Sequence, residues 1–216
     1  MKGVPGEEVP VLVRERAVDR VIVGTRGADM IERIVLGSVA EDLLHKVDVP
    51  VCIVGPRVRP QVRPDQEPAS ILFATSFNRS SRESAQLALE IANLHQARLT
   101  LLHVLPNGQE YEEFYKQRED QLFNLITEEA KLWSSPSIAI RAGDPATEIL
   151  AEATKLSADL IVLGTTGASK TARLLAAGVV HRVIAKAKAP VITLRQEQEV
   201  SKEYMYEQAA VSSLSA

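Results

Sequence analysis

The sequence has no long hydrophobic run, no large excess of either charge and only one cysteine. A membrane-spanning helix needs about 20 consecutive apolar residues, and because the chain has no such run we expect no membrane partner. The formal charge is -3 at pH 7 and the basic residues are scattered among acidic ones, which argues against nucleic acid as a partner. Cys52 has no second cysteine to pair with, and its apolar neighbours predict a small buried side chain.

The N-terminal residues MKGVPGEEVP lack the apolar core of a secretory signal, so we expect a cytoplasmic protein. With 216 residues and 45% hydrophobic content, the chain should form a soluble globule of one or two domains. The four histidines show no metal-ligand spacing and are predicted to be ordinary surface or second-layer residues: His45, His95, His103 and His181. No Ser-His-Asp constellation or nucleophile motif is present, so we predict neither catalytic residues nor a metal site.

An internal similarity links the two ends of the chain. Residues 17–57 resemble residues 157–197 at a constant offset of 140, with Gly24 matching Gly164 and Pro50 matching Pro190. The offset also aligns GVPGEEV near the N-terminus with GDPATEI after residue 142. We therefore predict two copies of one structural unit.

The boundaries of these copies follow from composition. Residues 58–68 are rich in proline and arginine and read as a linker, and residues 69–196 alternate predicted strands and helices as one complete domain. Within this domain, residues 110–133 predict one long amphipathic helix. Residues 197–216 form a tail that is either a short helix or a loose terminus.

The first copy, residues 1–57, supplies only the last two helices and the last two strands of the unit. Such a fragment leaves one edge and one face of its sheet exposed, and a chain of this size is marginally stable by itself. We expect it to borrow a surface from the second domain or from another chain.

Glycines follow the first predicted strand of the first copy at a spacing that suits an anion. Gly24, Gly27 and Gly37 let the backbone approach a ligand closely, and Ser38 adds a hydroxyl at a helix N-terminus, where the helix dipole favours phosphate. The spacing alone leaves two interpretations open. One is a phosphate-binding loop, and the other is a turn kept for chain reversal and helix packing.

Together with DRVIVG before the loop, DVPVCIV after it, the repeat, and ILFATSF in the second copy, this pattern resembles the universal stress protein family. The resemblance covers all but the linker and tail. It implies an α/β fold with an open, parallel, five-stranded sheet, helices on both faces and strand order 3-2-1-4-5, similar to adenine nucleotide α-hydrolases, here preceded by a partial copy. It also implies self-association through the last strands, residues 50–54 and 190–194, as an intrachain pseudo-dimer or a homodimer.

In nucleotide-binding members of this family, a loop matching Gly24, Arg26, Gly27, Gly37 and Ser38 wraps the ribose and phosphates. An aspartate at the end of the first strand holds the adenine. The first copy here has the loop but lacks that strand, so its adenine side is missing.

The second copy has the strand but departs from the family pattern at both halves of the site. Ser76 stands where binding members have aspartate, and Ala177 and Gly178 stand where the first copy has Gly37 and Ser38. The less favoured binding candidates are therefore those of the second copy: Thr75, Ser76, Gly164, Gly167 and Gly178.

The residues and the resemblance together favour a cytoplasmic stress-response module for binding or scaffolding over an enzyme. Its adenine nucleotide affinity, for ATP with magnesium, is expected to be weak and to reside at the first loop. The alternative is a nucleotide switch that binds ATP and hydrolyses it slowly.

Overall fold

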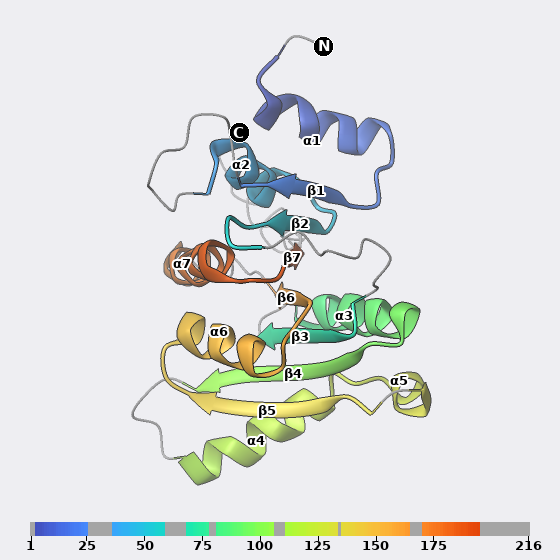
Figure 1. Cartoon of the computed structure of the whole chain (residues 1–216), viewed down its shortest axis with the longest axis vertical. Helices are drawn as coiled ribbons and strands as arrows, with labels where there is room; N and C mark the ends of the chain where they lie inside the picture. Colours follow the sequence, from blue (N-terminus) through green and yellow to red (C-terminus); the bar gives the residue numbers. More distant parts are fainter. Residues whose placement is uncertain are drawn as a thin grey trace, which may run out of the picture.

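The computed structural model describes residues 3–25, 36–58, 68–77, 81–105, 111–133, 135–164 and 170–194. Within these ranges a single sheet lies between two sets of helices (Figure 1). The strands are β1 (Val21–Gly24), β2 (Val51–Val54), β3 (Ser70–Thr75), β4 (Arg98–Leu105), β5 (Ser137–Ala142), β6 (Leu160–Gly164) and β7 (Val191–Leu194). The helices are α1 (Pro5–Glu15), α2 (Ser38–Lys46), α3 (Ser81–His95), α4 (Tyr111–Phe123), α5 (Glu128–Trp133), α6 (Pro145–Lys155) and α7 (Lys170–Lys186).

The sheet has the strand order β1-β2-β7-β6-β3-β4-β5. The predicted α/β class is confirmed, and the five strands of the second copy, read from β5 to β7, have the predicted order 3-2-1-4-5. The sheet is larger than the predicted five strands, because β1 and β2 also belong to it and bring the number of described strands to seven.

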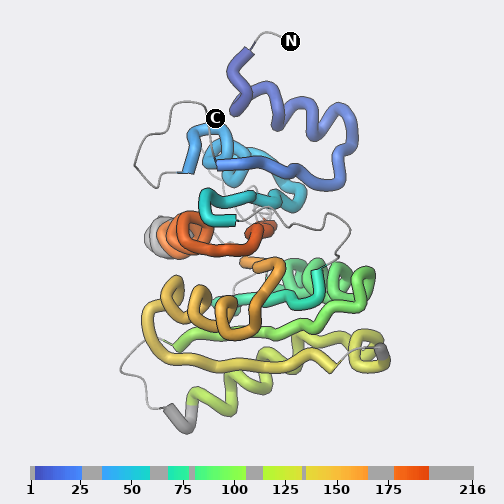
Figure 2. The backbone as a smooth tube through the Cα atoms, viewed as in Figure 1, coloured from blue at the N-terminus to red at the C-terminus, as the bar shows by residue number. Residues whose placement is uncertain are grey.

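One strand pair differs from the rest in direction. β2 pairs with β7 antiparallel, with Cys52 opposite Ile192, whereas the other neighbouring strands pair in parallel. Figure 2 shows the cyan β2 beside the red β7, two segments far apart in the sequence. As a result, the carboxyl ends of β1 and β2 point in the direction opposite to the carboxyl ends of β3 to β7.

Two of the four matched pairs of elements have the same bounds at the offset of 140 residues. Helices α1 and α6 cover residues 5–15 and 145–155, and strands β2 and β7 cover residues 51–54 and 191–194. The helices differ at their starts: Asp144 caps α6 by accepting a hydrogen bond from the Thr147 N–H at 3.1 Å, whereas Val4 precedes α1 without a side-chain cap.

Each face of the sheet has its own core. One core lies under α1, α2, α6 and α7 and includes Leu43, Ile53 and Ile184. The other lies under α3, α4 and α5 and includes Phe73 and Leu122. Helices on both faces are typical of a sheet built by crossover connections. Among the described residues, no helix has the length and apolarity that crossing a bilayer requires.

The prediction of one helix over residues 110–133 is wrong. The segment forms α4 and α5, and the Thr127 hydroxyl accepts a hydrogen bond from the Ala130 N–H at 3.2 Å, which starts a new helix. Leu132, an apolar residue in the second half of this segment, is 87% exposed, because the break changes the direction in which that half runs.

A glycine allows the first copy to approach α7. Gly55 directly follows β2, and a Cβ atom built on it would lie 2.3 Å from the carbonyl oxygen of Ile184. That oxygen belongs to the helix backbone and cannot rotate away. The packing of β2 against the second copy therefore requires a residue without a side chain at this position.

We expect Gly55→Ala to lower the free energy of unfolding by about 1–3 kcal/mol, because the added methyl forces the end of β2 away from α7. Urea denaturation followed by circular dichroism measures this change. The matched control is Gly178→Ala, in α7, where an added Cβ meets nothing within 4 Å. In a helix, this control should leave stability unchanged or raise it by up to about 1 kcal/mol. Equal stability of parent and Gly55→Ala would contradict the close packing.

Candidate functional site

The end of β1 and the start of α2 lie together. Thr25, directly after β1, is buried, and its N–H donates to the Val54 carbonyl at 3.1 Å, which ties the end of β1 to β2. Gly37 lies against this segment, since a Cβ atom on Gly37 would be 3.6 Å from the Thr25 carbonyl oxygen. The structure therefore brings Gly24 close to Gly37 and Ser38. Arg26 and Gly27 lie outside the described residues.

The start of α2 has the features of an anion site. Gly37 precedes the helix in an extended conformation, with φ -59° and ψ 146°, and no side chain caps it. The first N–H groups of a helix have no partner within the helix, and the dipole places partial positive charge there. Gly24 and Ser38 are both exposed, and an added Cβ at Gly24 would meet nothing within 4 Å. The described half of this loop therefore has room and hydrogen-bond donors for a phosphate.

The second copy presents a closed arrangement at the end of β3. The Thr75 hydroxyl donates to the Ser81 hydroxyl at 2.7 Å and accepts from the Phe77 N–H at 3.1 Å. The Thr75 carbonyl accepts from Nδ1 of His103 at 2.8 Å. Thr75, a candidate binding residue, is buried, and its side chain and carbonyl bond within the protein. Ser76 follows it as an exposed residue.

His103 on β4 is not the surface residue that was one of the two predicted alternatives. It is buried opposite Thr75, and its ring centroid lies 4.6 Å from that of Phe77, whose backbone is left-handed at φ 56°. The Arg118 guanidinium lies 5.5 Å from the Phe77 ring centroid. The burial of His103 could have been predicted from the strand LTLLHVL, because parallel pairing of this strand with ILFAT places His103 beside Thr75.

The environment of His103 disfavours the charged form of its imidazole. Burial is the main cause that lowers its pKa below the ordinary value of 6.5, and the Arg118 charge lowers it further, whereas the hydrogen bond to Thr75 opposes the shift. Because a carbonyl oxygen only accepts, the imidazole carries its proton on Nδ1. His103 thus holds the end of β3 in place as a neutral donor.

The helix that follows β6 is longer than the helix that follows β1: α7 covers Lys170–Lys186, and α2 covers Ser38–Lys46. Gly164 ends β6 half-buried, and Gly167 lies outside the described residues. Gly178, the counterpart of Ser38, is exposed but lies inside α7, which begins at Lys170. Backbone N–H groups in a helix interior donate to the preceding turn. Gly178 therefore offers no free helix N-terminus.

The candidate phosphate-binding residues after β1 and the candidate adenine-binding residues at the end of β3 lie far apart. Three strands separate β1 from β3 in the sheet, which corresponds to about 19 Å at the usual strand spacing. Because β2 and β7 are antiparallel, the carboxyl end of β1, with Gly24, and the carboxyl end of β3, with Thr75, also point in opposite directions. A composite site from these two ends is excluded by this geometry.

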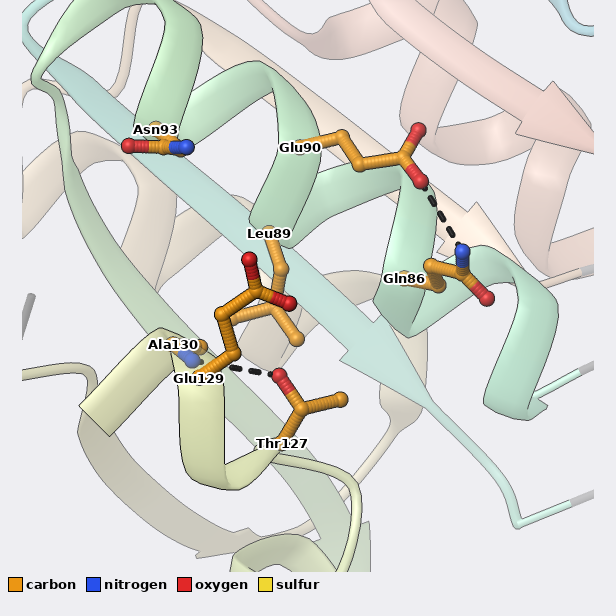
Figure 3. Close-up of a pocket in the computed structure, with 7 residues that line it drawn as sticks. All are labelled: Gln86, Leu89, Glu90, Asn93, Thr127, Glu129 and Ala130. Atoms are coloured by element: carbon orange, nitrogen blue, oxygen red, sulfur yellow. Dashed lines mark hydrogen bonds between the residues drawn. The ribbon is translucent and has the colours of Figure 1, made fainter. Parts of the chain in front are cut away.

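A hollow of about 250 Å³ lies between α3 and α5, away from all of these candidates. Figure 3 shows the residues that line it. The Gln86 amide donates to the Glu90 carboxylate at 2.9 Å, and Glu129 and Thr127 lie on the facing side. Two carboxylates in its lining make it unsuited to a phosphate. In the part of the chain that the structure describes, no group of three or more His, Cys, Asp or Glu is placed to hold a metal ion.

Comparison with known proteins identifies the family. The model of the universal stress protein family matches residues 2–55 and 69–195, and the chain belongs to this family. A universal stress protein of Synechocystis is 30% identical over 132 residues, covering 58% of this chain and 84% of the relative. Another, of Methanocaldococcus jannaschii, is 30% identical over 141 residues, covering 60% and 83%.

A solved structure agrees with the fold. The crystal structure of a universal stress protein from Archaeoglobus fulgidus superposes with a TM-score of 0.64 at 22% identity. The match covers 88% of this chain and 66% of the Archaeoglobus chain, so this chain spans just under two thirds of that protein.

We expect the free energy of unfolding to decrease as the pH falls below 6.5. The pKa of folded His103 is lower than that of the unfolded chain, so the unfolded state binds the proton first and gains stability. The contribution is complete above pH 6.5 and is lost as the pH falls through the lower, folded pKa. Urea denaturation at a series of pH values measures this dependence.

The variant His103→Gln keeps a donor toward Thr75 and removes the titrating group, so it should unfold with a flatter pH dependence in this window. His181→Gln removes a half-buried histidine of α7 and serves as the control. Identical pH profiles for the parent and His103→Gln would show that the buried imidazole is not linked to stability.

Proposed function

We propose that the chain is a cytoplasmic stress-response binding module that holds an adenine nucleotide weakly at the first glycine loop. The observation that supports this most is the packing of Gly37 against the Thr25 carbonyl, with exposed Gly24 and Ser38 beside an uncapped helix start. In this proposal the phosphates lie at the N-terminus of α2, and the N–H groups and the Ser38 hydroxyl donate to them.

The other loop residues serve the same ligand in this proposal. Arg26 adds a positive charge, and Gly27 lets the backbone approach the phosphates. ATP would bring magnesium with it, because Mg²⁺ is usually held by phosphate oxygens and water with few protein ligands. The module therefore needs no metal cluster of its own, and we assign no residue to catalysis.

The affinity is proposed to be weak because base recognition is reduced in both copies. At β1, the edge of the described sheet, no described strand lies beyond to hold an adenine. In the second copy, Ser76 replaces the aspartate of binding relatives. A lost hydrogen bond to a charged group costs about 1.5–3 kcal/mol, which is about ten- to a hundredfold in affinity.

Residues 1–57 and 69–196 are, in this proposal, two copies that associate through their last strands as a pseudo-dimer, with 58–68 as the linker. The pairing of β2 with β7 and the equal bounds of these strands support it. Both strands then have neighbours on each side, so a homodimer through them would require that pairing to open. Scaffolding of other proteins is part of the same proposal.

Titration of fluorescently labelled ATP with magnesium tests the nucleotide site. The parent should bind weakly but saturably. Ser38→Ala should raise the dissociation constant about three- to tenfold through one lost hydrogen bond. Gly27→Asp should abolish binding, because it places a side chain and a negative charge in the loop.

The matched control is Gly167→Asp, the same change at the counterpart of Gly27, which should bind like the parent. Loss of binding in this control, with Gly27→Asp unaffected, would move the site to the second copy. An assay of phosphate release from ATP separates the binding module from a hydrolysing switch, since the module should release none above background.

Whether the missing aspartate weakens ATP binding by the second copy is tested by placing an aspartate at position 76. Ser76→Asp should strengthen ATP binding about tenfold or more, because the carboxylate supplies a charged acceptor for the base. Ser76→Ala, which adds no acceptor, is the control and should bind like the parent. No gain in Ser76→Asp would show that the closed arrangement around Thr75, and not the missing acid, limits the second copy.

A further inference from the structure

Arg118 on α4 carries a half-buried positive charge that no described carboxylate neutralises. Among the described arginines, Arg118 and Arg141 are half-buried and the others are exposed. Arg141 forms an ion pair with the carboxylate of Glu152 at 2.7 Å. The Arg118 guanidinium instead donates to the neutral amide oxygen of Gln121 at 2.6 Å, and no ion pair joins it to a described residue. The two half-buried arginines therefore differ in whether the protein itself supplies the counter-charge.

Most of the hydrogen-bond donors of this guanidinium are unused within the described part of the chain. An arginine side chain has five N–H donors in a planar fork, and the bond to Gln121 uses one of them. Nε is buried and has no hydrogen-bond partner. Nη2 also makes no hydrogen bond to a described residue, and it is not enclosed as Nε is. The outer side of the fork is therefore accessible to an acceptor with a negative charge.

An aromatic contact holds the guanidinium in place. Its central carbon lies 5.5 Å from the ring centroid of Phe77, and that ring lies 4.6 Å from the ring of His103. His103 is fixed in turn by the hydrogen bond of its Nδ1 to the Thr75 carbonyl at 2.8 Å. Because these rings sit on the ends of β3 and β4, the position of the guanidinium is set by the sheet. A charge fixed in advance binds a ligand at a smaller entropic cost.

The location of Arg118 agrees with a ligand site. Phe77 follows directly after β3, and Thr75 pairs with His103, so β3 and β4 reach this end of the sheet together (Figure 1). Open α/β sheets bind ligands beyond the carboxyl ends of their strands. Helix α3 begins at Ser81, shortly after Phe77, and its dipole adds partial positive charge at the same end. The electrostatic field there favours an anion.

We propose that Arg118 forms an anion-binding site at the carboxyl end of β3, which takes the phosphate or carboxylate group of a small molecule. Both groups present two oxygens that match the guanidinium fork. The Phe77 ring supports the flat side of the guanidinium while its N–H groups point to the ligand. This site belongs to the second copy and does not depend on nucleotide binding at the first glycine loop.

Titration with inorganic phosphate tests the site. The signal is the nuclear magnetic resonance shift of the Phe77 backbone N–H, measured at neutral pH and at an ionic strength kept constant with sodium chloride. The parent should show a saturable shift with a dissociation constant of about 1–10 mM, as expected for one small anion. Arg118→Gln should raise this constant at least about tenfold, because the charge and the fork are both lost.

The matched control is Lys116→Gln, which removes the same charge from an exposed position of the same helix and should bind like the parent. Arg118→Lys keeps the charge and removes the fork, so it should bind about three- to tenfold more weakly than the parent. Circular dichroism establishes that the variants are folded. Ser38→Ala should leave the Phe77 signal unchanged, which separates this site from the proposed loop site.

The same titration with acetate distinguishes the two ligand chemistries, because the anion with the lower dissociation constant identifies the preferred group. Two outcomes would overturn the proposal. One is the absence of a saturable Phe77 shift with both anions, or a shift that sodium chloride alone reproduces. The other is an equal dissociation constant in the parent and in folded Arg118→Gln, which would leave Arg118 with a packing role against Phe77 only.

Discussion

The antiparallel pairing of β2 with β7 is the contact on which the remaining structure depends. It gives both strands a neighbour on each side and joins β1 and β2 to the other five described strands in one sheet. Gly55 makes the close approach to α7 possible, since a side chain there would meet the Ile184 carbonyl. A two-stranded fragment with exposed edges would be marginal, and sharing a sheet removes that weakness.

The direction of this pair also determines where ligands can bind. Open α/β sheets bind ligands beyond the carboxyl ends of their strands. Because β2 and β7 are antiparallel, these ends point in opposite directions for β1 and β2 and for β3 to β7. The glycine loop at β1 and the Thr75 segment at β3 are therefore independent. The Thr75 segment is bonded internally through Ser81 and His103, whereas the start of α2 keeps an exposed, uncapped terminus.

Much of this fold could be predicted from the sequence, and the failures have identifiable causes. The alternation of strands and helices predicted over residues 69–196 is confirmed. The helical pattern over residues 110–133 concealed a break, because apolar spacing does not register a threonine that starts a new helix. In α3, Leu94 is 71% exposed while Ala88 and Ala92 are buried, since close packing on the sheet selects small side chains. The role of His103 was not predicted, because it depends on a strand partner distant in sequence.

The sequence by itself determined the family, the positions of the strands, the glycine loop and the constant offset between the copies. These properties depend on neighbouring residues and on side-chain periodicity. Only the tertiary structure decided that the seven described strands form one sheet, and that Gly24 and Thr75 lie at opposite ends of its strands. These features depend on which strands pair and in which direction. Local sequence does not predict this pairing, because the backbone hydrogen bonds join segments that are distant in the chain.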